Sequence, residues 1–141
     1  PKFLLSNEPE LLNFTPDFTV GDYEISLLTP LRMKQKNILV RREIDFKSFI
    51  RQIAMRFENI TGDAIDKFEV KFRRFEQDLH FYDINRYSNR QHTKMQFGGV
   101  IGWMRVFGLD ERSAKFLQLA QITGVGKSTV FGLGKIKAER I

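Results

Sequence analysis

An apolar stripe with helical spacing between residues 45 and 58 constrains the fold more than any other part of the sequence. Its hydrophobic side chains recur at i, i+3, i+4, i+7, i+8 and i+11, and they are Phe46, Phe49, Ile50, Ile53, Ala54 and Phe57. This spacing puts all of them on one face of an α-helix that must pack against another apolar surface. Asp45 precedes the stripe and is a suitable N-cap. We therefore predict an amphipathic helix over 45–58, with Lys47, Arg51 and Arg56 off the stripe, toward water or a partner.

The segments on either side of this helix predict a strand before it and a connection after it. Residues 1–17 show little periodicity, so we interpret them as a lead-in or interdomain segment and 18–141 as the domain. β-Forming residues predict a strand near 22–29 that ends at Thr29-Pro30. Residues 62–79 fit strand and helix spacing equally well, and we treat them as a connecting element.

The second half of the chain predicts two more strands, a helix and a final strand. A long hairpin over 80–107 is expected to turn near Gly98-Gly99, a helix to run from Asp110 to about Gln121, and a strand to cover 134–141. The resulting order, βαββαβ, is that of the ferredoxin-like α+β fold. This fold has a four-stranded antiparallel sheet with both helices on one face, and it hosts many unrelated activities.

Basic residues are gathered into three blocks that acidic segments separate. The net charge is +6, and the blocks lie within 32–56, 86–107 and the tail from Lys127. The first block holds eight basic residues against two acidic ones, and the second holds no acidic residue. Three solvated faces that never meet are one interpretation. If folding brings the blocks together, they would form a surface for a polyanion.

The absence of certain residues and segments from the sequence argues against several kinds of binding site and against a membrane location. There is no Cys, so disulfides and thiolate metal sites are excluded. Two histidines, His80 and His92, cannot form a zinc site alone, and we expect no metal and no cofactor. No apolar run approaches the roughly 18 residues of a membrane span. With no signal peptide visible, we expect no membrane partner and a cytoplasmic location.

The glycine-rich segment at 122–134 contains Gly126-Lys127-Ser128, which suggests a phosphate-binding P-loop. That motif also needs a glycine at position 121, where this chain has Gln, and a strand before the loop with a helix after it. A P-loop is therefore disfavoured. Gly124, Gly126, Gly132 and Gly134 are explained either by turns and tight packing or by contact with a nucleic-acid backbone, and one loop can do both.

Four segments together resemble a known family. The pattern Gly-x-Gly-Lys-x-Thr-x-Phe-Gly-x-Gly over 124–134 resembles the closing loop of the CRISPR-associated RAMP superfamily. Three further segments resemble motifs of its repeat-processing endoribonuclease branch, and they are Leu28–Lys34 (LTPLRMK), Arg86–Gln91 (RYSNRQ) and Met95–Gly102 (MQFGGVIG). They occur in the expected order and cover roughly Val20 to Ile141. The resemblance is to the C-terminal half of proteins that usually carry two ferredoxin-like domains.

The resemblance implies that the protein binds the repeat of a precursor CRISPR RNA and cuts it without a metal. In such enzymes a base activates a ribose 2′-OH, and the products carry a 2′,3′-cyclic phosphate and a 5′-OH. This chemistry needs a His or Tyr near the 2′-OH and a cation near the phosphoryl oxygens. In relatives that use a His, it commonly lies in the N-terminal half. The implied partners are repeat RNA, an N-terminal ferredoxin-like domain and, as a further candidate, other CRISPR effector subunits.

The residues themselves predict an RNA-binding surface more readily than a catalytic centre. Alternate positions from 86 to 94 share one face if this segment is a strand, and a cationic face suits phosphate contacts. The predicted RNA-binding residues are Arg32, Lys34, Lys36, Arg86, Ser88, Arg90, Gln91, Lys94, Lys127, Ser128 and Thr129. The general base is unknown. His92 is a candidate, although an exposed hairpin histidine is the simpler interpretation.

Two other functions remain open from the sequence. The first is a non-catalytic RNA-binding subunit of a CRISPR ribonucleoprotein on the same fold. The second is a general RNA-recognition module, but the aromatic K/R-G-F/Y motif of that module is not found.

Overall fold

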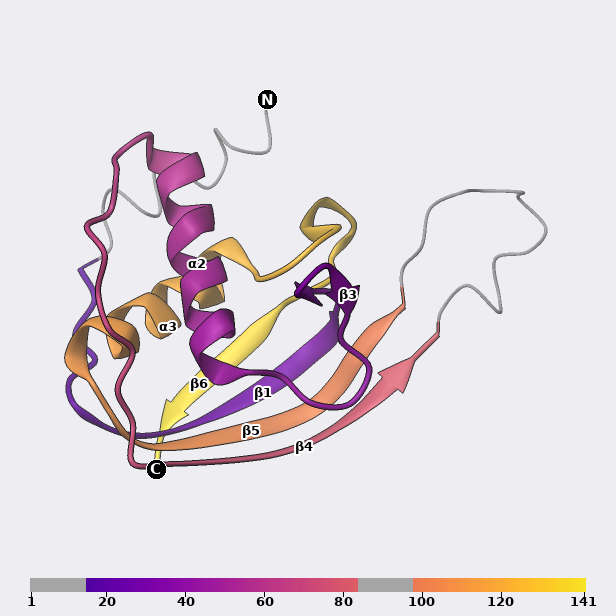
Figure 1. Cartoon of the computed structure of the whole chain (residues 1–141), viewed down its shortest axis with the longest axis horizontal. Coiled ribbons are helices and arrows are strands. Elements are labelled where there is room, and N and C mark those ends of the chain that lie inside the picture. The colour runs from indigo at the N-terminus through magenta and orange to yellow at the C-terminus, as the bar shows by residue number, and fades with distance from the viewer. Residues whose placement is uncertain (1–14, 84–97) are drawn as a thin grey trace.

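The computed structural model describes residues 15–83 and 98–141, and its main element is a four-stranded sheet with two helices packed on it (Figure 1). The strands are β1 (Gly21–Leu31), β4 (Arg74–Tyr82), β5 (Gly99–Leu109) and β6 (Ile136–Arg140), in the spatial order β4-β5-β1-β6. Every neighbouring pair is antiparallel. The helices α2 (Phe46–Thr61) and α3 (Glu111–Thr123) cover the same face of the sheet. The predicted ferredoxin-like α+β fold is confirmed.

Local sequence signals set the ends of both helices. The Asp45 carboxylate accepts a hydrogen bond from the backbone N–H of Ser48 at 3.3 Å, which confirms Asp45 as the N-cap of α2. Asp110 caps α3 in the same way, through the N–H of Ser113 at 3.0 Å. Helix α2 ends at Gly62, whose φ of 77° is the left-handed conformation of a helix C-cap. Helix α2 continues to Thr61, about one turn beyond the predicted end at residue 58.

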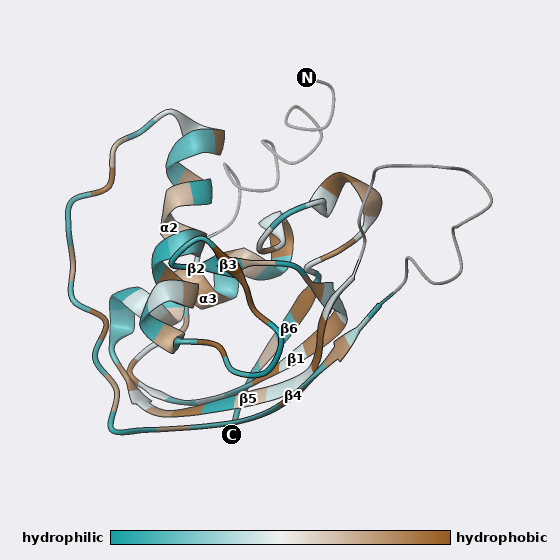
Figure 2. Cartoon of the chain, turned by 45° about the vertical axis from the view of Figure 1, so that its right-hand side comes forward, coloured by the Kyte–Doolittle hydropathy of each residue, from teal (hydrophilic) through white to brown (hydrophobic). Residues whose placement is uncertain are grey.

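The core is rich in aromatic side chains, because the predicted apolar stripe of α2 packs against the inner face of the sheet. Phe46 and Phe49 are buried, and the rings of Phe72 and Phe75 lie 5.5 and 5.0 Å from that of Phe46. The strands contribute alternate residues, among them Tyr23. In Figure 2 hydrophobic and hydrophilic residues both occur around α2, as a helix with one buried face requires.

Two predicted strand features differ in the structure. Strand β1 continues past Thr29-Pro30 to Leu31, because a register shift between Leu27 and Leu31 accommodates the missing N–H of Pro30. The hairpin does not turn at Gly98-Gly99, because Gly99 is the first residue of β5 and pairs with Tyr82. A side chain at Gly99 would collide with the backbone of Leu31, so this glycine permits close packing and does not form the turn.

The segment over 62–79 resolves into two parts. Residues 62–73 form an extended connection without regular secondary structure, as a connecting element should, whereas 74–79 belong to β4. Val70 is buried, and Phe68 and Phe72 pack against the core from this connection. Sequence spacing alone missed the small hairpin of β2 (Lys34–Gln35) and β3 (Ile38–Leu39).

Candidate nucleic-acid interface

The glycine-rich loop is held against the C-terminal end of β1 by backbone hydrogen bonds. The N–H of Lys127 donates to the carbonyl of Arg32 at 2.7 Å, and that of Gly134 donates to the carbonyl of Pro30 at 2.9 Å. Within the loop, the N–H of Val125 donates to the carbonyl of Gly134 at 2.9 Å and closes its base. The loop follows α3 and precedes β6, which is the reverse of the order that a P-loop needs.

All four glycines of the loop have a positive φ: Gly124 72°, Gly126 80°, Gly132 89° and Gly134 74°. At Gly126 a Cβ would collide with the Arg32 carbonyl, and at Gly134 with the Val125 carbonyl. Turns and tight packing therefore account for these glycines, as one of the two interpretations predicted. The same geometry brings the bare backbone of the loop to the end of β1.

Thr29 fixes the loop from the side of β1. Its hydroxyl donates to the carbonyl of Gly132 at 2.7 Å and accepts a hydrogen bond from the N–H of Lys135 at 2.9 Å. The Thr29 side chain thus joins the C-terminal part of β1 to a loop residue 103 positions away in the sequence. The sequence signalled this segment through its motif but did not show that the hydroxyl contacts the loop.

Arg56, on α2, holds the loop from the side of that helix. Its guanidinium donates to the carbonyl of Gly126 and, at 3.2 Å, to the hydroxyl of Thr129. Burial lowers the pKa of Arg56, although a guanidinium stays charged at physiological pH. Sequence reasoning placed Arg56 off the apolar stripe and missed this role, because no local pattern predicts which loop a helix will meet.

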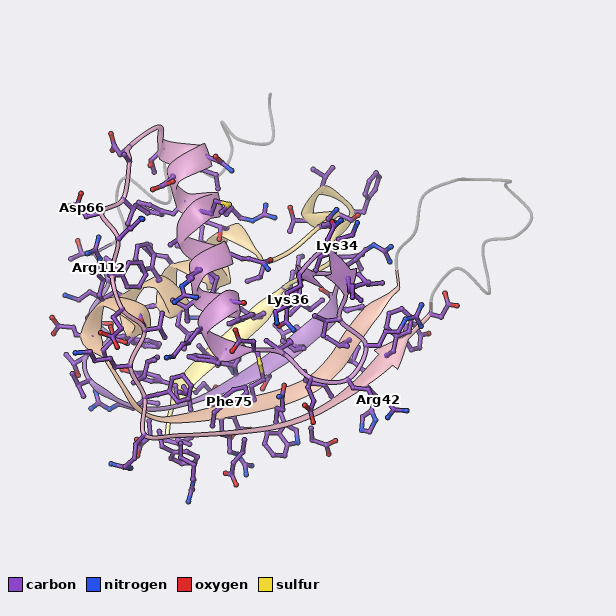
Figure 3. The ribbon with its side chains drawn as sticks, in the orientation of Figure 1. Lys34, Lys36, Arg42, Asp66, Phe75 and Arg112 are labelled. Carbon is purple, nitrogen blue, oxygen red and sulfur yellow. The ribbon has the colours of Figure 1, made fainter. Side chains whose placement is uncertain are left out.

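The β2–β3 hairpin brings the first basic block to the same place. Its turn residues, Lys36 and Asn37, have φ of 49° and 65°, as a tight two-residue hairpin turn requires. Gln52 of α2 donates to the carbonyl of Lys34 at 2.8 Å and holds the hairpin against the helix. Figure 3 shows Lys34 beside the glycine-rich loop. Lys34 and Lys127 line one groove of about 540 Å³, so the first block and the tail meet here.

Most of the second basic block lies outside the described residues. The predicted residues Arg86, Ser88, Arg90, Gln91, Lys94 and the candidate His92 lie outside the described residues. Its described member, Arg105, lies on the face of the sheet that the helices leave open, 3.6 Å from the Glu24 carboxylate and 4.4 Å from the Trp103 ring centre. On β6, the edge strand that pairs with β1, Lys137 pairs with Glu139 at 2.7 Å. Where it is described, the open face thus pairs several of its cations with acids or aromatic rings.

His80 is the histidine that the structure describes, and it lies on β4. Its Nε2 is 3.1 Å from the carboxylate of Asp78, and both side chains are exposed. It does not line the groove at Lys34 and Lys127.

Two classes of feature are absent from the described part of the chain. Residues 15–83 and 98–141 contain no group of three His, Cys, Asp or Glu side chains that could hold a metal ion. Neither described helix is long and apolar enough to cross a bilayer.

A groove lined by cations and bare loop backbone at the end of a ferredoxin-like sheet is typical of a polyanion-binding α+β domain. The model of the family described as CRISPR-associated endoribonuclease Cas6 matches residues 25–136. The chain therefore belongs to the Cas6 family, as its motifs predicted. No curated protein matches the chain.

Solved Cas6 structures are similar in fold. The Cas6 chain of a product complex is 18% identical to this chain, with a TM-score of 0.57. The match covers 93% of this chain and 55% of that Cas6 chain. Cas6 of Thermus thermophilus is 15% identical with a TM-score of 0.61 over 86% and 55%. A partial Cas6-RT-Cas1–Cas2 complex is 15% identical with a TM-score of 0.60 over 98% and 26%. The chain spans about half the length of the first two.

Proposed function

We propose that this chain is the C-terminal RNA-binding domain of a CRISPR-associated endoribonuclease that cleaves precursor CRISPR RNA within its repeats. One observation carries the proposal: Lys34 and Lys127, which are 93 positions apart by their numbers, line one groove beside the glycine-rich loop of a Cas6-family chain. RNA helices are recognised largely through phosphate and 2′-OH contacts, for which such a surface is suited. Ser128 and Thr129 complete the predicted contacts on the loop. The other predicted contacts are Arg32, just after β1, and Lys36, at the turn of the β2–β3 hairpin.

The domain organisation is part of the proposal. Residues 18–141 form the RNA-binding domain, 1–17 lead into it, and an N-terminal ferredoxin-like domain of the same protein is its partner. The extent of the similarity supports this division, because the chain covers 55% of a Cas6 product complex. Other CRISPR effector subunits are further candidate partners. The cytoplasm, where precursor transcripts are made, is the proposed location.

The proposed chemistry is a metal-independent transesterification. A base removes the proton of a ribose 2′-OH, its oxygen attacks the adjacent phosphorus, and the bond to the 5′ oxygen of the next nucleotide breaks. The leaving 5′ oxygen takes up a proton from a general acid or from water. The products are a 2′,3′-cyclic phosphate and a 5′-OH. Cations beside the groove would stabilise the charge that develops on the phosphoryl oxygens. His92 remains a candidate for the base, alongside a group in the partner domain.

A non-catalytic RNA-binding subunit is the second candidate function. The observation that favours it is the composition of the groove, because no histidine or tyrosine lines it as far as the described residues show. The groove therefore offers binding groups without an acid–base pair.

Cleavage of repeat RNA separates the two functions. The full-length protein is incubated with its repeat RNA in the presence of a chelator, and with the same RNA carrying a single 2′-deoxy substitution at the cut site. We expect cutting at one position, a cyclic phosphate end, and no cutting of the 2′-deoxy RNA. Binding without cutting would support the non-catalytic subunit, and cutting that the chelator abolishes would contradict the proposed chemistry.

Charge-removing variants test the interface. Lys127→Ala should weaken RNA affinity and reduce the slope of log K against log salt by about 0.7–0.9, the contribution of one phosphate contact. Lys71→Ala is the matched control, because Lys71 is an exposed cation on the connection between α2 and β4, beside Glu69 at 3.9 Å. Arg90→Ala should behave like Lys127→Ala. Equal slopes for wild type, Lys127→Ala and Arg90→Ala would remove the proposed contact surface.

A further inference from the structure

A second face of helix α2 lines the groove beside the glycine-rich loop, and it differs in chemistry from the face that enters the core. Its side chains recur at i, i+3, i+4, i+7 and i+8, and they are Gln52, Met55, Arg56, Asn59 and Ile60. Lys34 lines the groove from β2 and the buried Met33 from the link between β1 and β2, and Gly126 and Lys127 line it from the loop. The helix thus presents one continuous strip of side chains to this groove.

The groove combines three kinds of chemical group. Exposed Met55 and half-buried Ile60 supply apolar contact, and Gln52 and Asn59 supply amides. Lys34, Arg56 and Lys127 supply positive charge, and no carboxylate lines the groove among the described residues. Its volume of about 540 Å³ lies within the range of small-molecule sites.

Some polar side chains of the groove hold neighbouring segments in place, and others keep donors or acceptors that no described residue uses. Arg56 is engaged by Gly126 and Thr129, so it positions the loop. The NH₂ group of Gln52 donates a hydrogen bond to the Lys34 carbonyl, and its amide oxygen remains as an acceptor. The Asn59 side chain makes no hydrogen bond to any described residue, and it is exposed. An amide that can donate and accept at once is the group that reads the edge of an unpaired base.

We propose that the groove between α2 and the glycine-rich loop holds one unpaired nucleotide of the bound RNA. The base lies against Met55 and Ile60, the Asn59 amide bonds its edge, and Lys34 and Lys127 contact the flanking phosphates. The charge supports this occupant, because a groove with three cations and no described carboxylate is complementary to a polyanion. The proposal rests on the proposed RNA-binding function and adds a site that selects for single-stranded RNA.

The test removes one base at a time and leaves the phosphate charge intact. Repeat RNAs with a single abasic site at each unpaired position are titrated against the full-length protein and its Asn59→Ala variant. For wild type we expect one position at which the abasic site weakens binding by about 5- to 30-fold. At that position Asn59→Ala should add nothing to the loss, because the base and the amide act as one pair. The salt slope should stay unchanged, since no phosphate contact is removed.

Matched controls separate this site from general effects on folding or charge. Met55→Ala should weaken binding of intact RNA and leave that of the abasic RNA unchanged. Val20→Ala is its control, because Met55 and Val20 are both 59% exposed and Val20 precedes β1, at the opposite end of the sheet from the loop. Val20→Ala should change neither affinity.

Three results would overturn the proposal. In the first, no position of the RNA is sensitive to an abasic site. In the second, the loss of affinity caused by Asn59→Ala and the loss caused by the abasic site add to each other. The third is a free mononucleotide that binds in an Asn59-dependent way while no RNA position couples to Asn59. If Lys127→Ala still lowers the salt slope in these cases, the RNA-binding function stands and only the nucleotide site fails. If wild type shows no salt-dependent binding of repeat RNA, the proposed function itself fails.

Discussion

Replacing Gly126 by Ala tests how the glycine-rich loop is built, and Gly132 provides a control within the same loop. Both glycines have a left-handed φ, 80° and 89°, in which an L-residue costs about 1–2 kcal/mol. They differ in their surroundings, because a Cβ at Gly126 would meet the Arg32 carbonyl whereas a Cβ at Gly132 has no atom within 4 Å. Alanine therefore strains the backbone at both positions, but it collides with another residue at Gly126 and not at Gly132.

The expected difference in stability between Gly126→Ala and Gly132→Ala follows from the contacts that the collision at Gly126 would break. Moving the loop away from Arg32 breaks the hydrogen bond from the N–H of Lys127, which contributes about 0.5–1.5 kcal/mol, and disturbs the contact of Arg56 with the Gly126 carbonyl. We therefore expect Gly126→Ala to lower the free energy of unfolding by about 1–3 kcal/mol more than Gly132→Ala. For a domain of this size that corresponds to a Tm lower by roughly 3–10 °C.

Urea unfolding and thermal melts of both variants, followed by circular dichroism, measure this difference. RNA affinity is a second measurement, because a displaced loop carries Lys127 with it. Gly62→Ala, with a φ of 77° and open space around it at the end of α2, is expected to leave RNA affinity unchanged. Equal destabilisation by Gly126→Ala and Gly132→Ala would refute the close approach of the loop to β1.

Three further predictions concern the scaffold. Phe46→Ala should destabilise the domain by about 3–5 kcal/mol in denaturant unfolding, because it empties the centre of the aromatic core, and a loss under 1 kcal/mol would contradict that packing. Asp45→Ala should cost about 1 kcal/mol through the lost N-cap, and a variant as stable as wild type would show that the cap contributes nothing. Burial raises the pKa of Tyr23, so its contribution is present below the unfolded-state value near 10 and is lost as pH rises through the higher folded value. Tyr23→Phe should therefore flatten the fall in stability above pH 10, and parallel pH curves would contradict this.

The sequence determined the elements whose signal is local. The apolar stripe of α2 and its Asp45 cap were predicted from spacing alone, because a helix buries one face whatever lies opposite. The order of strands and helices then restricted the topology to the ferredoxin-like unit. Four motif segments of the sequence indicated the family. The sequence also pointed to the glycines of the closing loop, although it left packing and RNA contact equally open.

Tertiary structure decided which of these segments meet. The contact of Arg56 with Gly126 spans 70 positions, and no periodicity within either segment predicts it. Gly99 gave a turn signal by composition, but its place beside Leu31 shows that the glycine serves a close approach between strands. The groove at Lys34 and Lys127 exists because β1, α2 and the loop converge. Local sequence encodes the conformation of each segment, whereas a binding surface depends on distances between segments that only the packed core fixes.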